Sequence, residues 1–259
     1  MLKTCHAVSH FLDTMSPDAQ YVLYLDIDGT LAEFQLDPQD SFIPEKTLHL
    51  LSCLIAVDIP VILLTGRCLA EAQKLAKGLN VEIAASHGLD LYLKQKKYVP
   101  NLDPQVIHDL QQRVTQACQG LALRLEYKDY SIAIHYREYP ESVQLAEKIA
   151  RQTVQDFPNF YLKKGQYVWE IAPKAANKGS AIIQIQNILN ADHACPIFIG
   201  DDVTDEDGFA VIHQLRGISI KVGQGQTQAH YRIRNVVECA NFLENFTKKI
   251  IHHKNRSMQ

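Results

Sequence analysis

The sequence YLDIDGTL, residues 24–31, ends an apolar run with two aspartates that are two positions apart. The apolar run begins at Tyr21, and it lacks the alternation of polar and apolar residues typical of a half-exposed strand. A short continuous apolar run bounded by turn residues is typical of a central strand in a parallel sheet. We therefore expect Asp26 and Asp28 to lie where the first strand of such a sheet ends.

Two more runs of the same kind follow, IPVILLTG at 59–66 and PIFIGDD at 196–202. Helical patterns at 45–57 and 69–79 accompany them, so the order is strand, helix, strand. This order predicts an α/β fold with a doubly wound, Rossmann-like parallel sheet.

The middle of the chain interrupts this order. Residues 121–137 predict a hairpin, residues 142–157 a helix, and residues 161–171 a second hairpin that turns at Gly165. We therefore expect an α+β cap domain at 100–173 inserted into a core made of 1–99 and 174–259. Pro100 and Pro173 would lie near its hinges.

Composition narrows the choice of partners. The chain has 259 residues, 46% of them hydrophobic, and a formal charge of -3 from 26 basic and 29 acidic residues without a polybasic stripe. This argues for a small-molecule substrate and against nucleic acid or anionic lipid as partners. No apolar stretch approaches the roughly 20 residues that span a bilayer, and the N-terminus lacks the apolar core of a signal peptide. We expect no membrane partner and a cytoplasmic location, where the six scattered cysteines would be reduced.

Polar residues follow each of the three apolar runs. In open parallel sheets the ligand crevice lies outside the carboxyl ends of the strands, so these residues should gather at one edge. A lysine that opens a predicted helix should face the same crevice. The residues are Asp26, Asp28, Thr65, Gly66, Arg67, Lys178, Asp201 and Asp202.

Carboxylates gathered at one point repel one another unless a cation lies among them, and oxygen ligands alone suit magnesium better than zinc. A lysine, a threonine and helix amides beside such an ion are what a phosphoryl group needs. The chain has no G-x-x-x-x-G-K-[ST] loop, so an aspartate nucleophile is the expected route. The sequence disfavours an EF-hand calcium loop, because its fifth, sixth and twelfth positions would hold Thr30, Leu31 and Asp37.

Four motifs carry a resemblance to a known family. DIDGTL at 26–31, TGR at 65–67, NKG at 177–179 and GDDVTDE at 200–206 resemble, in this order, the motifs of haloacid dehalogenase-like phosphatases. Three further segments are similar to trehalose-6-phosphate phosphatases, and the similarity extends from about residue 20 to about residue 245. These segments are HYR at 135–137, VWEIAP at 168–173, and GDDVTDEDGF at 200–209 with the later VGQGQTQA at 222–229.

The resemblance implies roles for the core residues. Asp26 would attack phosphorus, and Asp28 would protonate the leaving sugar oxygen and then activate water. Thr65 and Lys178 would hold the phosphoryl oxygens. Mg²⁺ would be held by Asp26, by the backbone carbonyl of Asp28 and by Asp201. Asp202 and Asp205 would either bind the ion directly or hold the residues that do. Of the two, Asp202 is assigned as a direct ligand and Asp205 as a residue that supports the ligands.

The cap would select the sugar, with Gly66 and Arg67 of the core also binding substrate. On the strand SIAIHYR, period-two alternation places His135 and Arg137 on one face. Glu170 alternates away from its apolar neighbours, and Lys128 lies at a hairpin tip. We expect these four residues to bind substrate, although His135 and Glu170 are equally compatible with ordinary hairpin positions. Gln166 stands where the family often has a basic residue.

The implied activity is magnesium-dependent hydrolysis of trehalose 6-phosphate to trehalose and phosphate through an aspartyl-phosphate, as a step in trehalose biosynthesis. A functional link to a trehalose-phosphate synthase is the expected partnership. Two alternatives stay open. One is a phosphatase for another sugar phosphate such as sucrose 6-phosphate, or a mutase with the same phospho-aspartate. The other is a catalytically silent module that binds a phosphosugar.

Overall fold

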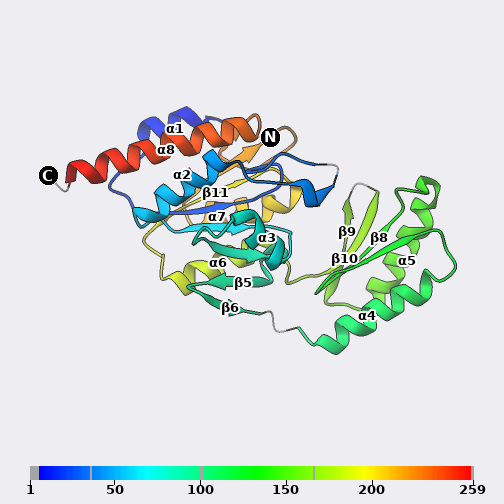
Figure 1. The fold of residues 1–259 in the computed structure, drawn as a ribbon. Coiled ribbons are helices and arrows are strands. Elements are labelled where there is room, and N and C mark those ends of the chain that lie inside the picture. Colours follow the sequence, from blue (N-terminus) through cyan, green and yellow to red (C-terminus); the bar gives the residue numbers. More distant parts are fainter. Residues whose placement is uncertain (1–5, 36, 100–101, 166, 258–259) are drawn as a thin grey trace. The chain divides into compact units, whose positions relative to one another are not determined.

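The structure is a computed structural model that describes residues 6–35, 37–99, 102–165 and 167–257 (Figure 1). The chain divides into two compact units, Met1–Val99 with Asn177–Gln259, and Pro100–Ala176. The first unit resumes at Asn177 and not at 174, because the intervening turn is bonded into the second unit: Lys174 N–H donates to Asn159 O at 2.8 Å, and Ala176 N–H donates to Pro173 O at 2.9 Å. The predicted hinge at Pro100 lies outside the described residues.

The first unit contains a sheet of nine described strands in the order β1-β13-β12-β11-β2-β3-β4-β5-β6. Neighbours are parallel from β1 to β4, and β5 and β6 add an antiparallel edge. The strands are β1 His6–Ala7, β2 Tyr21–Leu25, β3 Val61–Leu64, β4 Glu82–Ala85, β5 Asp90–Leu93, β6 Lys96–Tyr98, β11 Cys195–Gly200, β12 Ile218–Val222 and β13 Tyr231–Ile233.

Helices cover both faces of this sheet. The α-helices of the unit are α1 Val8–Thr14, α2 Glu45–Ala56, α3 Leu69–Ala76, α6 Lys178–Leu189, α7 Glu206–Gln214 and α8 Val236–Ser257. Three short 3₁₀ helices are η1 Pro38–Asp40, η2 Ser86–Gly88 and η4 Val203–Asp205. None of the described helices has the length and apolar character needed to cross a membrane.

Strand β2 shows why the sheet is buried on both faces. All five of its residues are buried. Tyr21, Leu23 and Leu25 pack into one apolar cluster with α1, α2, α3 and α8, while Val22 and Tyr24 pack into a second cluster with α6 and α7. A strand that must satisfy two apolar layers cannot alternate in sequence, which is why the run from Tyr21 is continuously apolar. The predicted doubly wound α/β fold is confirmed.

The second unit is an antiparallel sheet with the order β7-β8-β10-β9. Its helices α4 and α5 pack on one face through an apolar cluster that includes Ile132, Ile134 and Tyr136. Its strands are β7 Arg124–Tyr127, β8 Ile132–His135, β9 Phe160–Gly165 and β10 Val168–Pro173; its helices are α4 Pro104–Ala117, η3 Pro140–Ser142 and α5 Val143–Asp156. The alternation predicted for β8 is therefore present, with its apolar side chains facing the helices.

Candidate active site

The carboxyl ends of β2, β3 and β11 carry the predicted site residues. Strand β2 lies between β3 and β11, so the chain continues from β2 to one side and returns on the other. Such a switch point is where α/β sheets form ligand crevices. Asp26 directly follows β2, is 5% exposed, and donates its N–H to Ile199 O of β11 at 3.0 Å.

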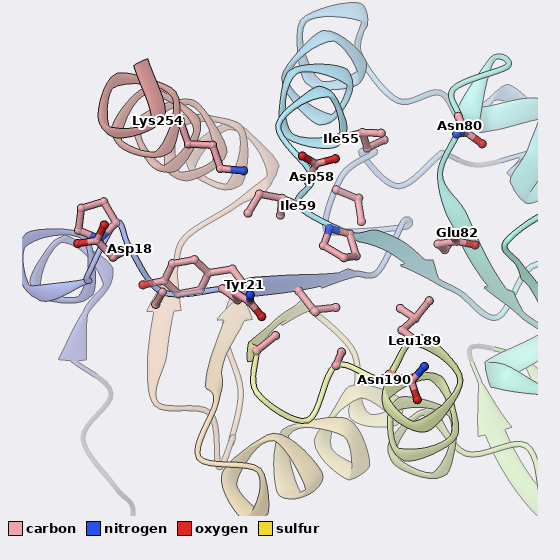
Figure 2. Close-up of a pocket in the computed structure, with 18 of the residues that line it drawn as sticks. Asp18, Tyr21, Ile55, Asp58, Ile59, Asn80, Glu82, Leu189, Asn190 and Lys254 are labelled. Carbon is pink, nitrogen blue, oxygen red and sulfur yellow. The ribbon is translucent and has the colours of Figure 1, made fainter. Parts of the chain in front are cut away.

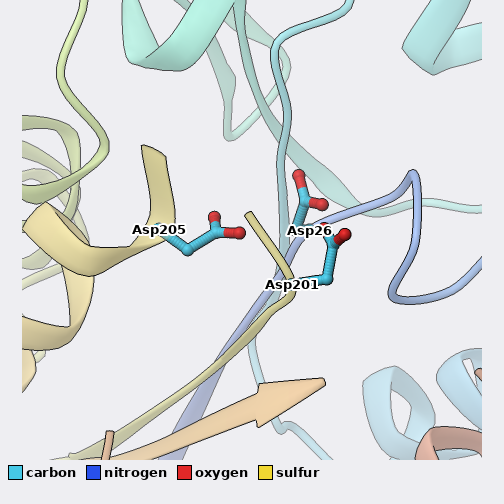
Figure 3. A group of neighbouring side chains, drawn as sticks. All are labelled: Asp26, Asp201 and Asp205. Atoms are coloured by element: carbon cyan, nitrogen blue, oxygen red, sulfur yellow. The ribbon is translucent and has the colours of Figure 1, made fainter. Parts of the chain in front are cut away.

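Three carboxylates and one ammonium group meet at this switch point. Ligand oxygens of Asp26, Asp201 and Asp205 lie within 4.8 Å of one another (Figure 3). Lys178, at the first position of α6, extends its Nζ to Asp26 Oδ1 at 2.7 Å and to Asp205 Oδ1 at 2.6 Å. Lys178 is 2% exposed, Asp26 is 5% exposed and Asp205 is fully buried, so these three groups are shielded from water, while Asp201 is partly exposed.

Burial and mutual repulsion disturb the protonation of the cluster. Burial raises the pKa of Asp26 well above its usual range, against the lowering effect of Lys178. The pKa of Asp201 rises to about 7, mainly through burial and then through the charges of Asp205 and Asp202. Burial disfavours the charged form of Lys178, but Asp205 and Asp26 outweigh it and raise its pKa. The acidic charge therefore exceeds what Lys178 neutralises.

The excess of acidic charge around Lys178 predicts that the free energy of unfolding depends on pH when EDTA is present. A carboxyl whose folded pKa is about 7 holds a proton that the unfolded chain releases near 4, so its contribution to stability falls as pH rises between these values. Asp201→Asn removes this contribution. The stability of the wild type relative to Asp201→Asn should decrease from pH 5 to pH 8, measured by urea unfolding at each pH. A difference that does not change with pH would contradict the prediction.

The donor set fits a hard divalent cation. All candidate ligands are carboxylate oxygens, which suit magnesium. Asp201 Oδ1 is buried and has no hydrogen-bond partner, and a buried acceptor of this kind is costly unless a cation or donor satisfies it. By contrast, Asp205 is already satisfied, because Oδ1 accepts from Lys178 and Oδ2 accepts from Asp202 N–H at 2.8 Å.

Asp202 does not join the acidic cluster formed by the described residues, although it was predicted to be a metal ligand. Its side chain is exposed and accepts from Thr204 Oγ1 at 3.2 Å. The 3₁₀ turn η4 follows Asp202, and its last residue, Asp205, lies in the cluster.

Asp28 and Arg67 form a two-point ion pair. Arg67 Nε donates to Asp28 Oδ2 and Arg67 Nη2 donates to Oδ1, both at 2.7 Å. Ser41 Oγ adds a third bond to Oδ1 at 3.1 Å. The hydrogen bond to Asp28 raises the pKa of Arg67. Asp28 thus turns toward β3 and its loop, and the acid and the arginine that were predicted separately contact each other.

Thr65 follows β3 and is 1% exposed. Its Oγ1 accepts the N–H of Arg67 at 3.1 Å, and its own N–H donates to Ala84 O of β4 at 2.9 Å. Because Oγ1 is the acceptor in the first bond, the hydroxyl proton is left to donate elsewhere. Gly66, between Thr65 and Arg67, is exposed.

Lys221 belongs to this edge but was not predicted. It lies on β12, is 4% exposed, and donates to the backbone carbonyls of Asp201 and Asp202, the latter at 3.3 Å. It therefore holds the loop that presents Asp201. A lysine near the carboxyl end of the apolar run GISIKV, residues 217–222, was the signal that could have revealed it.

A pocket of about 820 Å³ lies elsewhere in the first unit (Figure 2). Its lining includes Tyr21 at the start of β2 and Val61 at the start of β3. Asp26 and Thr65 follow the ends of the same strands, so the pocket opens at the opposite edge of the sheet. It is not the predicted crevice.

The predicted residues of the second unit form a polar network on its sheet. Glu170 of β10 accepts from Lys128 Nζ at 3.0 Å and from Ser131 Oγ at 2.7 Å. Burial opposes ionisation of Glu170, but these partners hold its pKa below the usual range. His135 pairs with Glu126 Oε2 at 2.8 Å, and Arg137 is exposed beyond β8. Gln166 lies outside the described residues.

Solved structures place the fold in a class. A haloacid dehalogenase-like hydrolase from Bacteroides thetaiotaomicron is similar with a TM-score of 0.66 at 14% identity, covering 88% of this chain and 99% of that one. A trehalose-6-phosphate phosphatase C-terminal domain from C. albicans is similar with a TM-score of 0.79 at 19% identity, covering 95% and 99%. At such identities the likeness concerns the fold, which is that of the haloacid dehalogenase-like hydrolases.

Sequence comparison identifies one family among the proteins with this fold. The family model described as trehalose-phosphatase matches residues 24–236. The trehalose-6-phosphate phosphatase of Escherichia coli strain K12 is 33% identical over 238 residues, which cover 91% of this chain and 90% of the relative. The chain belongs to the trehalose-phosphatase family, and the resemblance seen in its motifs is confirmed.

Proposed function

We propose that the protein hydrolyses trehalose 6-phosphate to trehalose and inorganic phosphate. The observation that carries the proposal is the buried Asp26 at the sheet switch point, with Lys178 Nζ at 2.7 Å and the Asp201 and Asp205 carboxylates around it. A nucleophilic carboxylate suits phosphoryl transfer when it lies beside the ammonium group of a buried lysine and beside further carboxylates that can bind a metal ion. The family membership supplies the substrate class.

The proposed reaction has two displacements. In the first, a carboxylate oxygen of Asp26 forms a bond to phosphorus while the bond from phosphorus to the sugar oxygen breaks, and Asp28 gives its proton to that oxygen. In the second, Asp28 takes a proton from water, whose oxygen bonds to phosphorus and releases the Asp26 carboxylate. Thr65 would donate its hydroxyl proton to a phosphoryl oxygen, and Lys178 would neutralise charge beside the nucleophile.

The pairing of Asp28 with Arg67 adds a condition to this scheme. Arg67 donates to both oxygens of Asp28, so the carboxyl group proposed to act on the leaving sugar oxygen is held by another partner. The phosphoryl group of the substrate offers Arg67 a competing anion. We propose that Arg67 transfers to the substrate, as the sequence predicted for a substrate-binding residue, and that Asp28 is then free to carry a proton.

Magnesium is the proposed cofactor, bound by Asp26 and Asp201 with the backbone carbonyl of Asp28. Asp201 is chosen because its Oδ1 has no partner, and Asp205 remains a support because both of its oxygens are bonded. Asp202 is no longer proposed as a direct ligand. When bound, the ion would neutralise the acidic cluster and draw electron density from the phosphoryl group.

The second unit is proposed as the cap that selects the sugar. Lys128 and Glu170, already fixed to each other, would offer a donor and an acceptor to sugar hydroxyls, and His135 and Arg137 would extend the same face. A cytoplasmic location and a functional link to a synthase are also proposals at this point.

Phosphate release measured across a panel of sugar phosphates tests the function. The panel contains trehalose 6-phosphate, sucrose 6-phosphate and glucose 6-phosphate, each with excess magnesium or excess EDTA. We expect release from trehalose 6-phosphate with magnesium, and background release in EDTA. Preference for sucrose 6-phosphate would replace the proposed substrate. Binding of phosphosugar without any release would favour the silent module and overturn the enzymatic proposal.

A further inference from the structure

The turn Ser86–Gly88 after β4 has an unusual backbone. Three consecutive residues have positive φ, with 50° at Ser86, 56° at His87 and 93° at Gly88. For residues other than glycine this conformation is sterically unfavourable, and it persists only where the surroundings enforce it. Strain of this kind next to strands that carry site residues indicates a positional requirement.

The strained turn is bonded to the loop that carries Thr65. Ser86 N–H donates to Arg67 O and His87 N–H donates to Thr65 O, both at 2.8 Å. The imidazole of His87 lies against Gly66, because a Cβ added at Gly66 would come within 2.6 Å of Cε1 and 2.7 Å of Nε2. Two backbone hydrogen bonds thus hold the loop 65–67, and the imidazole ring of His87 packs against it.

The other side of the same turn packs on the helix that carries Lys178. A Cβ added at Gly88 would come within 2.2 Å of the Ala181 Cβ and 3.6 Å of Asn177 O, at the first turn of α6. Even a methyl group at Gly88 would push the helix away. The turn therefore lies between the loop that carries Thr65 and the helix that carries Lys178, and it contacts both.

We propose that His87 is a positioning residue of the phosphate site: its ring, held by the strained turn, keeps the Thr65–Arg67 loop in register with the Lys178 helix. This inference rests on the proposed phosphatase function. Thr65 and Lys178 must address the same phosphoryl group, yet they belong to segments 113 residues apart, and the turn packs against both segments. The ring contributes shape, and no proton transfer is assigned to it.

His87→Asn tests the proposal, because asparagine tolerates positive φ and lacks the ring. A displacement of about 1 Å at a catalytic group can lower the rate by around a hundredfold, so we expect kcat/KM to fall by about ten- to a hundredfold, mostly in kcat. The shape of the pH profile should not change. Arg216→Asn is the matched control, since Arg216 also has a φ of 56° and is exposed away from the site, and its activity should equal that of the wild type.

Hydrogen exchange gives a readout that does not depend on turnover. Peptides that contain residues 61–68 should exchange faster in His87→Asn than in the wild type, and at the wild-type rate in Arg216→Asn. Gly66→Ala should also lower activity, and combining it with His87→Asn should cost less than the sum of the two losses, because the clash is then relieved.

Three results would overturn the positioning role. They are unchanged kcat and exchange in His87→Asn, loss of one limb of its pH profile, or strictly additive effects with Gly66→Ala. A wild-type protein that releases no phosphate from any sugar phosphate would instead reject the proposed function. In that case the exchange comparison still decides whether His87 holds the loop.

Discussion

Asp26→Asn is expected to abolish phosphate release from trehalose 6-phosphate, with kcat lowered on the order of 10⁴-fold or more, the loss seen when an enzyme loses its nucleophile. The amide cannot form the proposed acyl phosphate. The variant should still fold, because its amide oxygen can accept the bond from Lys178 that the carboxylate accepts at 2.7 Å. In EDTA its melting temperature should equal or exceed that of the wild type, since one of three crowded acidic charges is removed.

Two measurements check this prediction. Steady-state phosphate release gives the loss of rate, and intact mass after rapid acid quenching detects one bound phosphate in the wild type and none in the variant. Asp13→Asn, on the exposed side of α1, is the control and should behave as the wild type. Substantial magnesium-dependent release by Asp26→Asn would reject Asp26 as the nucleophile.

Lys178→Met is expected to destabilise the protein by about 3–5 kcal/mol, the cost typical of removing one partner of a buried charge pair. Lys178 bonds Asp26 and Asp205 at 2.7 and 2.6 Å, and all three side chains are buried. Without the ammonium, two carboxylates would face each other in a site closed to water. The free energy of unfolding in urea, measured in EDTA, provides the test.

A second variant separates charge from packing. Lys178→Met combined with Asp205→Asn removes one of the two buried charges that Lys178 neutralises, and it should recover part of the lost stability without recovering activity. Lys74→Met, on the exposed side of α3, is the control and should change stability by less than about 0.5 kcal/mol. Equal destabilisation of the single and double variants would show that the ion pairs are not the cause.

Local sequence patterns predicted much of the fold because their causes are local. The run from Tyr21 to Leu25 must be apolar at every position to fill two layers, and this is visible without a structure. The predicted helix at 45–57 corresponds to α2, Glu45–Ala56, and the one at 142–157 to α5, Val143–Asp156. Four of the described α-helices, α1, α4, α7 and α8, were not predicted from the sequence. For α4 a local signal was present, because Asp103 caps the helix and Pro104 opens it.

The sequence by itself determined the strand ends that carry Asp26, Thr65 and Asp201, because parallel strands bring their carboxyl ends to one edge whatever the loops do. Only the tertiary structure decided how these groups are paired. Arg67 reaches Asp28 across 39 residues and Lys178 reaches Asp26 across 152. Three further contacts also join segments that are distant or separate in the sequence. Asp205 bonds Lys178, Lys221 bonds the backbone of Asp202, and the ring of His87 packs against Gly66. Each depends on which backbone segments pack together, and spacing along one strand or helix carries no information about that.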